Sequence, residues 1–427
     1  MTPVVVIGGG AAGMLAAWRS ASLGAPTLLL EKKHRLGTKI LISGGGKCNL
    51  THAGTMESLR QKFRANEGRF LRPSFYRFTN EDYLRLLTDL GMEVYTRPDG
   101  RIFPVPPADA HDVVALMETV VRNAGVTVRL ETPTSGVATD SGGIVGVDTE
   151  SGERIAARQV IIATGGSSFP ATGCTGDGWR WLGNLGHTIV PLRAALAPLY
   201  LDPTPSADWS GVALRDCVLK ARAAHADGTP GRERMRWRGD LLFTHKGVSG
   251  PTALGVSREV AEAIPEESLV EVDLLPDEPH DRLTAALIAH CRENPRRSVS
   301  DFTERYVPHR LVPAVFGAAA TEPSVRGAHL GQKERNRLVN TLKAWPLGRV
   351  RHVPLERGEV VAGGVSLDEV DPQTMRSKIV RGLYLCGEVL DIAGPVGGYN
   401  LQAAWSTGFV AGETAARDAL STEQERT

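Results

Sequence analysis

Two glycine-rich segments near the N-terminus have the residue types and spacing of loops that hold phosphate. In the first, Gly8, Gly10 and Gly13 follow the apolar run Val4–Ile7, and Glu31 comes 18 residues after Gly13. The first glycine allows a tight turn, the second admits a pyrophosphate, and the third lets helix and strand pack closely. The carboxylate of Glu31 suits the two hydroxyl groups of a ribose. The pattern predicts a bound nucleotide at a helix N-terminus rather than an empty glycine-rich turn.

The second segment, SGGGKC at Ser43–Cys48, is not a P-loop. That motif requires a glycine six residues before its lysine and a hydroxyl residue after it. Leu41 and Cys48 occupy those positions around Lys47, so a magnesium-dependent nucleotide triphosphatase is excluded. The remaining interpretations are a nucleotide held by backbone amides, with no side chain in the way, and a tight turn that needs three glycines for steric reasons.

The apolar runs of the sequence predict the strands and the helix that hold these two loops in place. Val4–Ile7 and Thr27–Leu30 read as buried parallel strands, with a helix between them to about Leu23. Two later runs, QVIIATG ending at Gly165 and LYLCGE ending at Glu388, predict further strands that end in glycine turns. This order resembles FAD-binding folds rather than NAD dehydrogenases, and it places SGGGKC beneath the flavin.

A dedicated nicotinamide domain is not expected, since no second complete glycine fingerprint follows a strand and precedes a helix. The nearest candidate, SGGIVG at 141–146, has the polar context of a hairpin. NAD(P)H, as a donor, would have to dock transiently against the flavin.

Composition and charge indicate a globular cytoplasmic protein. The chain has 427 residues, 42% of them hydrophobic, and a formal net charge of +1. That balance argues against affinity for nucleic acid or membranes. Five scattered cysteines without a C-x-x-C pair favour free thiols in a reducing compartment. No apolar run reaches the roughly 18 residues that span a bilayer. Nothing in the pattern indicates an oligomeric state.

The hydrophobic pattern of the sequence changes between residues 191 and 345. Residues 191–275 alternate in the manner of antiparallel strands, and residues 276–345 have the amphipathic period of helices. We therefore expect a discontinuous nucleotide-binding domain made of residues 1–190 and 346–427.

The motifs resemble the bacterial FAD-dependent oxidoreductases that include aminoacetone-oxidase-like proteins and BaiN-type bile-acid dehydro-reductases. The matching segments cover nearly the whole chain: VVVIGGGAAG (4–13), KILISGGGKCNLTH (39–52), GRIFP (100–104), VIIATGGSSFPATGCTGDG (160–178), LLFTHKGVSGP (241–251), VVAGGVSLDEVDPQTMRSK (360–378) and GLYLCGEVLDIAGPVGGYNLQAAWSTG (382–408). The resemblance implies an α/β fold in which a Rossmann-like FAD-binding domain carries an inserted antiparallel β-barrel, itself bearing a small helical subdomain.

The resemblance also implies non-covalent FAD and a small organic substrate that reacts at the flavin. Within this resemblance, His245 and Lys39 are the catalytic candidates, and for His245 a structural role in its glycine-rich turn is the open alternative. The amides of Gly398, Tyr399 and Asn400 are free donors at a helix start facing the flavin. The expected FAD contacts are Gly8, Gly9, Gly10, Ala11, Ala12, Gly13, Glu31, Lys32, Lys39, Ser43, Gly44, Gly45, Gly46, Asn49, Thr134, Ala163, Thr164, Gly165, Gly387, Glu388, Gly397, Gly398, Tyr399, Asn400 and Leu401.

Several reactive residue types have plainer interpretations. Cys48 has no partner cysteine five residues on, where Ala53 stands, so a packed thiol is favoured over a redox disulfide. His34 and His52 are ordinary loop histidines rather than covalent flavin attachments. The arginines at every second position from Arg232 to Arg238 form either a solvated strand face or a basic face for RNA or an acidic substrate.

Two other functions remain open at this point. One is a FAD-dependent RNA-modifying enzyme, which the arginine strand suggests. The other is a flavin-binding protein without turnover. No metal site is expected.

Overall fold

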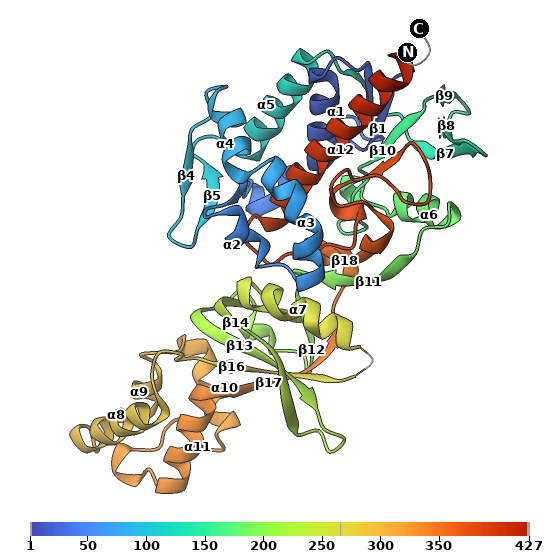
Figure 1. Cartoon of the computed structure of the whole chain (residues 1–427). Helices are drawn as coiled ribbons and strands as arrows, with labels where there is room; N and C mark the ends of the chain where they lie inside the picture. The colour runs from blue at the N-terminus through green and yellow to red at the C-terminus, as the bar shows by residue number, and fades with distance from the viewer. Residues whose placement is uncertain (1, 265, 425–427) are drawn as a thin grey trace. The chain divides into compact units, whose positions relative to one another are not determined.

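The computed structural model describes residues 2–264 and 266–424, and the chain forms two compact units (Figure 1). Unit 1 comprises Met1–Leu192 and Glu359–Thr427, and unit 2 comprises Arg193–Gly358. In the part of the chain that the structure describes, no helix is long and apolar enough to cross a membrane.

Unit 1 is built on a five-stranded parallel sheet in the order β19-β10-β1-β2-β6. Its three central strands are buried along their whole length or nearly so, as the runs VVVI, TLLL and QVII predict. The parallel sheet confirms the Rossmann-like fold expected from the sequence. The strands are β1 (Val4–Ile7), β2 (Thr27–Leu30), β6 (Thr127–Arg129), β10 (Gln159–Ile162) and β19 (Leu383–Leu385).

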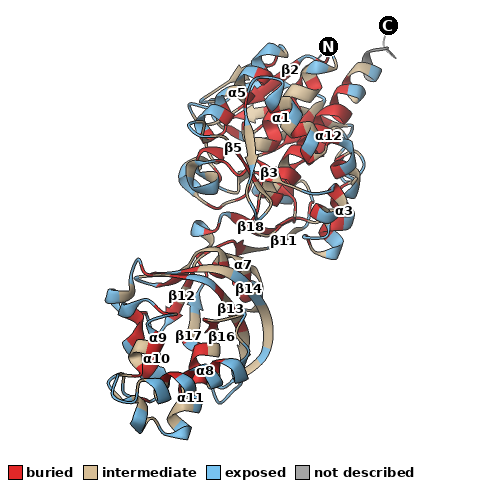
Figure 2. Cartoon of the chain, turned by 90° about the vertical axis from the view of Figure 1, so that its left-hand side faces the viewer, coloured by how far each residue is buried: buried red, intermediate tan, exposed pale blue. Residues whose placement is uncertain are grey.

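Two helices from opposite ends of the chain, α1 (Ala11–Ser22) and α12 (Tyr399–Gln424), pack against each other in unit 1. A Cβ at Gly408 would lie 2.2 Å from the carbonyl oxygen of Ala12, and one at Gly412 would lie 2.1 Å from that of Ala16. Only glycine at these two positions, four residues apart, allows the backbones to approach so closely. Figure 2 shows both helices lined with buried residues.

The remaining elements of unit 1 surround this centre. Two small antiparallel sheets, ordered β3-β5-β4 and β7-β8-β9, include the hairpin expected around residues 141–146. The chain leaves and re-enters the unit through the pair β11-β18. The bounds are β3 (Thr51–His52), β4 (Val94–Thr96), β5 (Arg101–Pro104), β7 (Thr134–Asp140), β8 (Gly143–Thr149), β9 (Arg154–Ala156), β11 (Ile189–Ala195), β18 (Val360–Val365), α2 (Met56–Arg60), α3 (Ala65–Arg77), α4 (Asn80–Thr88), α5 (Ala110–Asn123) and α6 (Asp177–Asn184).

Unit 2 contains a closed antiparallel barrel in the order β12-β15-β14-β13-β16-β17, as the alternating pattern predicts. The long hairpin β13–β14 supplies much of its wall, and α7 (Pro251–Ala263) packs on that hairpin. Phe243 and Trp345 meet in the barrel core at 5.8 Å between ring centroids. The strands are β12 (Leu199–Asp202), β13 (Ala213–Ala224), β14 (Pro230–Thr244), β15 (Gly247–Ser249), β16 (Ser268–Asp273) and β17 (Trp345–His352).

A helical segment enters unit 2 between the neighbouring strands β16 and β17. It contains α8 (His280–Glu293), α9 (Ser300–Thr303), α10 (Val312–Ala318) and α11 (Gln332–Lys343), and its leucines share one core with the barrel. The sequence pattern placed the return to the first domain at residue 346. The structure instead keeps β17 in the barrel, because this strand pairs with both β12 and β16.

A buried histidine ties α6 and β11 to the segment that follows β18. His187 Nε2 lies 2.9 Å from Ser377 Oγ, and its Nδ1 lies 3.1 Å from a carboxylate oxygen of Glu369. Ser377 Oγ also accepts hydrogen bonds from the amides of Ile379 and Val380. The order resembles a serine–histidine–carboxylate relay, but the serine oxygen has no free lone pair to attack with. This chain of bonds is a structural lock.

His187 should make stability depend on pH. Burial lowers the pKa of this imidazole, and Glu369 offsets that effect only in part. The unfolded chain therefore binds a proton more readily than the folded one, so stability is complete above the ordinary histidine pKa of about 6.5 and falls as the pH drops below it. We expect the melting temperature of His187→Gln to fall less between pH 8 and pH 5.5 than that of the wild type.

Thermal melts of the FAD-loaded protein across that range measure the difference. The exposed His329, changed to Gln, is the matched control and should behave as the wild type. Equal acid sensitivity in His187→Gln and the wild type would contradict the assignment.

Candidate functional site

The first glycine turn connects the carboxyl end of β1 to α1. A Cβ at Gly13 would lie 1.8 Å from the carbonyl oxygen of Gly8, so the helix touches the strand end only because this residue is glycine. A Cβ at Gly10 would meet nothing within 4 Å. The turn thus leaves open space in front of the first amides of α1, which have no acceptor within the helix.

Glu31 stands at the end of β2, beside this turn. One carboxylate oxygen accepts the amide of Gly9 at 2.7 Å, and the other accepts the amide of Lys33 at 2.8 Å. These bonds hold the carboxylate next to the glycine turn, where the sequence predicts the adenosine ribose.

Lys39 and Glu388 bring three distant motifs together. Lys39 Nζ lies 2.7 Å from Glu388 and 2.8 Å from the hydroxyl of Ser168, which follows the ATG strand. The second oxygen of Glu388 accepts the amide of Val361 in β18 at 3.0 Å. Burial alone would lower the pKa of Lys39, but Glu388, together with Cys174 and Glu359, offsets burial and raises the pKa. Lys39 is therefore a fixed positive charge rather than a base.

The SGGGKC loop begins in a short 3₁₀ segment, Ile40–Gly46, whose regular geometry breaks at Ser43, Gly44 and Gly45. Gly44 and Gly45 have φ of 58° and 67°, the left-handed region that favours glycine. Cβ atoms at Gly45 and Gly46 would meet open space or ordinary contacts. The loop therefore exposes backbone, as the nucleotide interpretation requires.

Asn49 connects this loop to the start of α12. In the amide orientation that satisfies both of its ends, Asn49 donates to the carbonyl of Thr51 at 3.1 Å and accepts the amide of Gly398 at 2.8 Å. Gly398 is therefore not the free donor that the sequence suggested. The first amides inside the helix, those of Tyr399, Asn400 and Leu401, have no acceptor within it.

The ring of Tyr399 is fixed at the same helix end. It stacks on His52 with 4.7 Å between centroids, and Phe63 meets it edge-on at 6.3 Å. Both ring nitrogens of His52 lie within hydrogen-bond distance of backbone carbonyls, those of Ala53 and Asp99. These contacts suit a structural histidine better than a flavin attachment point.

Lys32 and Thr134 have different surroundings. Lys32 Nζ is held by Asp177 at 2.8 Å and by the hydroxyl of Thr175 at 2.6 Å, so its charge is already paired. The Thr134 hydroxyl is buried, and it has no partner among the described residues; the same holds for Thr164. Buried orphan hydroxyls are costly, which favours a ligand that satisfies them.

Cys48 fits the packed-thiol interpretation. Its side chain is fully buried, and burial raises the pKa of the thiol to about 12, so almost no thiolate exists at neutral pH. All five cysteines are free, as the sequence predicts.

The second catalytic candidate, His245, belongs to unit 2. It is exposed in the tight turn between β14 and β15, where the Thr244 hydroxyl accepts the amides of Lys246 and Gly247. Its part in a site with residues of unit 1 stays a prediction.

Two groups near Lys39 were not singled out from the sequence. Ser168 lies inside a quoted motif, but nothing in its spacing indicates that it binds a lysine. Glu359, just before β18, is exposed as a residue, but desolvation of its carboxyl group raises its pKa, with Lys39 and Arg101 offsetting part of the effect. No sequence motif identifies Glu359, because its neighbours come together only in the folded chain, where β18 lies beside the Glu388 turn.

Several independent features of unit 1 match what an FAD-binding site requires. Space is open at Gly10, and the N-termini of α1 and α12 both present amides without helical acceptors. Thr134 and Thr164 each have a buried hydroxyl in need of a partner. Within the described residues no cluster of side chains could hold a metal ion.

Comparison with known proteins agrees with this geometry. Residues 2–414 match the family described as HI0933-like protein Rossmann domain. The chain is 30% identical over 422 residues to the 3-dehydro-bile acid delta(4,6)-reductase of Clostridium scindens, covering 97% of this chain and 99% of the relative. It is also 30% identical over 408 residues to the ribosomal RNA dihydrouridine synthase of Escherichia coli, covering 95% and 96%.

Among solved structures, the fold is similar to that of 3-ketosteroid delta1-dehydrogenase from Sterolibacterium denitrificans. The TM-score is 0.53 at 13% sequence identity, with 97% of this chain and 99% of that chain covered.

The open space at Gly10 provides a direct test of the nucleotide site. Gly10→Val places methyl groups where the pyrophosphate is expected, so the variant should purify with less than about a tenth of the wild-type FAD. Absorbance of the flavin released by denaturation measures the content. Gly136→Val is the matched control, since a Cβ there also meets nothing within 4 Å and the residue lies in β7. Full flavin content in Gly10→Val would show that the pyrophosphate lies elsewhere.

Proposed function

The chain belongs to the HI0933-like family of Rossmann-domain proteins and is a FAD-dependent oxidoreductase, and we propose that it reduces a carbon–carbon double bond conjugated to a carbonyl group in a small organic substrate. One observation supports this most strongly. The glycine turn, the SGGGKC loop, the ATG strand and the Gly-Glu turn are far apart in sequence but meet in unit 1, next to the Lys39–Glu388 ion pair.

The names of the relatives suggest the reaction type. A delta(4,6)-reductase of a 3-dehydro bile acid acts on double bonds conjugated to a 3-oxo group. A dihydrouridine synthase saturates the uracil double bond that is conjugated to a ring carbonyl. Both reactions add a hydride to the carbon β to the carbonyl and a proton to the α carbon. The same chemistry in this chain is the simplest proposal that accommodates both.

The charges in unit 1 suit this reaction. When bound and reduced by a two-electron donor, FAD would supply the hydride and be left oxidised. Hydride addition leaves negative charge on the substrate carbonyl oxygen, and a fixed donor or cation close to that oxygen lowers the barrier. The α12 amides without helical acceptors are such donors, at the positive end of a helix dipole. Lys39, which stays protonated but is paired with Glu388, is a further candidate for this role. The α carbon takes its proton from solvent.

The two units have separate roles in this proposal. Unit 1 holds FAD without a covalent bond, and His245, in the β14–β15 turn of unit 2, is the candidate for substrate contact. In this proposal NAD(P)H is the donor that reduces the flavin, and it docks transiently. The five free cysteines support a cytoplasmic location.

A second candidate substrate for the same reaction is uracil within RNA. The ribosomal RNA dihydrouridine synthase relative favours it, because its match extends over 95% of this chain. The sequence offered only the arginine strand in support. Both candidates share the flavin chemistry and differ in what must be bound around the reacting ring.

An anaerobic assay tests the reaction without knowledge of the natural donor. The enzyme is reduced with dithionite and mixed with 2-cyclohexen-1-one, a 4-ene-3-ketosteroid, uridine or a uridine-rich RNA. We expect at least one conjugated carbonyl compound to reoxidise the flavin and to gain two hydrogens, detected by mass spectrometry. The matched saturated ketone should leave the flavin reduced. If oxygen reoxidises the flavin but none of these compounds does, the proposed reaction is wrong.

His245 should affect catalysis without affecting the cofactor. In His245→Ala we expect flavin reoxidation by substrate to slow by about tenfold, the value of one hydrogen bond of roughly 1.4 kcal/mol, with unchanged FAD content. His225→Ala is the control, because it removes another exposed histidine from a turn of the barrel. Equal rates in both variants would exclude His245 from the substrate site.

A further inference from the structure

The segment leading into and through α3 concentrates positive charge. Residues 60–77 contain six arginine or lysine side chains and one acid, Glu67, although the whole chain has a net charge of only +1. Glu67 is 1% exposed. Arg60 pairs with Glu57 and Arg77 pairs with Glu413, so the charge that this segment offers to a partner depends on its remaining cations.

Three of these cations have no carboxylate partner. Among the described residues, the side chains of Lys62 and Arg72 make no hydrogen bond or ion pair, and Arg69 only reaches the carbonyl of Ala65 in its own helix, at 3.3 Å. All three are exposed. An anion can therefore bind these three side chains without breaking an existing salt bridge.

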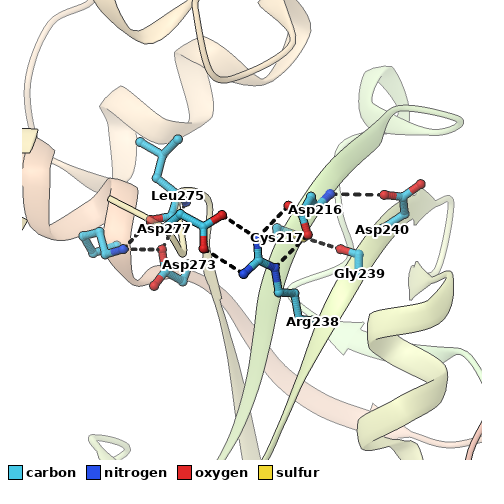
Figure 3. A network of polar contacts seen from close by, with 9 residues as sticks. Asp216, Cys217, Arg238, Gly239, Asp240, Asp273, Leu275 and Asp277 are labelled. Atoms are coloured by element: carbon cyan, nitrogen blue, oxygen red, sulfur yellow. Dashed lines mark hydrogen bonds and ion pairs between the residues drawn. The ribbon is translucent and has the colours of Figure 1, made fainter. Parts of the chain in front are cut away.

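The arginines of β14 are different. Arg234 pairs with Glu266, Arg236 pairs with Glu233, and Arg238 lies between Asp216 and Asp277 (Figure 3). A phosphate would have to displace these carboxylates. The strand that the sequence marked as a basic face is therefore largely neutralised, and the sequence could not show this because most of the partners come from other elements.

An aromatic side chain, Tyr76, lies on the same stripe of α3 as the unpaired cations Arg69 and Arg72. Arg69, Arg72 and Tyr76 follow at intervals of three and four residues, which places them on one stripe of the helix. Tyr76 is 56% exposed, and its hydroxyl donates to Glu57, whose charge Arg60 balances. From Arg69 to Tyr76 the stripe extends about 10 Å along the helix. It is longer than a single phosphate or carboxylate group needs.

This stripe belongs to the same unit as the candidate site. Phe63, between Lys62 and α3, meets Tyr399 edge-on at 6.3 Å, and α3 packs against α12. A Cβ at Gly394, in the turn before α12, would lie 2.7 Å from the ring of Phe63. A strand bound along α3 would therefore approach the start of α12 at the Phe63 end of this segment.

We propose that Lys62, Arg69, Arg72 and Tyr76 form a docking surface for the backbone of single-stranded RNA, with Tyr76 as a stacking platform for one base. The proposal rests on the second substrate class above, uracil in RNA. Three unpaired cations on one segment suit the phosphodiesters of a strand, and the exposed ring of Tyr76, one helical turn beyond Arg72, suits an unpaired base. A lipid surface would require more apolar side chains than the lone Tyr76.

Fluorescence anisotropy with a labelled uridine-rich RNA of about 20 nucleotides tests the surface, using the full-length FAD-loaded protein at 50 to 200 mM KCl. The triple variant Lys62→Ser, Arg69→Ser, Arg72→Ser should bind at least about tenfold more weakly. The slope of log K against log salt should fall by about 2, since each phosphate contact on a single strand contributes roughly 0.7. Tyr76→Leu should weaken binding by about fivefold or more, through lost stacking.

The matched control is Arg215→Ser, Arg236→Ser, Arg238→Ser in the barrel, which removes the same charge from exposed but paired arginines. It should keep the wild-type salt slope. Equal losses in the two triple variants, binding to anionic vesicles without RNA binding, or no RNA binding by the wild type at 50 mM KCl would overturn the proposal. Flavin content and reoxidation by small conjugated ketones should be unchanged in the α3 variant, so failure of the RNA surface is distinguishable from failure of the proposed reaction.

Discussion

The close approach of α1 to its neighbours is the constraint on which the rest of unit 1 depends. Gly13 lets the helix start against the turn at Gly8, while Gly408 and Gly412 let α12 lie against the backbone of Ala12 and Ala16. A side chain at Gly13 would push α1 away from the turn at Gly8, and one at Gly408 or Gly412 would push the two helices apart. Their N-termini, and the amides without acceptors at those ends, are thereby held at fixed places relative to the parallel sheet.

Around that packed centre, charge is arranged in pairs that bind segments to one another. Glu388 holds both Lys39 and the backbone of β18, and Glu31 holds the glycine turn through Gly9. The cost of keeping these carboxylates partly buried is offset by charge-assisted hydrogen bonds. One consequence for chemistry is that Lys39 stays cationic. It can stabilise negative charge on a cofactor or a substrate, but it cannot accept a proton.

The two basic regions illustrate why charge must be counted with its partners. Four arginines at alternate positions on β14 are conspicuous in the sequence, but three of them are bound to carboxylates. The cations at Lys62, Arg69 and Arg72 are spaced less regularly and stay unpaired. An ion pair at the surface is weak in itself, yet it still removes a cation from the set that a polyanion meets without competition.

Local patterns determined much of this protein from the sequence alone. The buried strands Val4–Ile7 and Thr27–Leu30, the glycine turn and the helix beginning at Tyr399 follow from short-range rules of hydrophobic period and backbone freedom. The antiparallel barrel followed from alternation and the helices of the insert from their own period. These features depend on residues that are close together in the chain, so they can be predicted from the sequence.

Only the tertiary structure decided which groups meet. The bond from Asn49 that takes up the Gly398 amide, the pairing of Lys32 with Asp177 and the capture of Lys39 by Ser168 and Glu388 join residues far apart in the chain. The same is true of the extent of the barrel, because β17 was assigned by its partners β12 and β16 rather than by its own residues. Hydrogen bonds and ion pairs act over a few ångströms, so which of them form is decided by where the packed backbone brings each side chain.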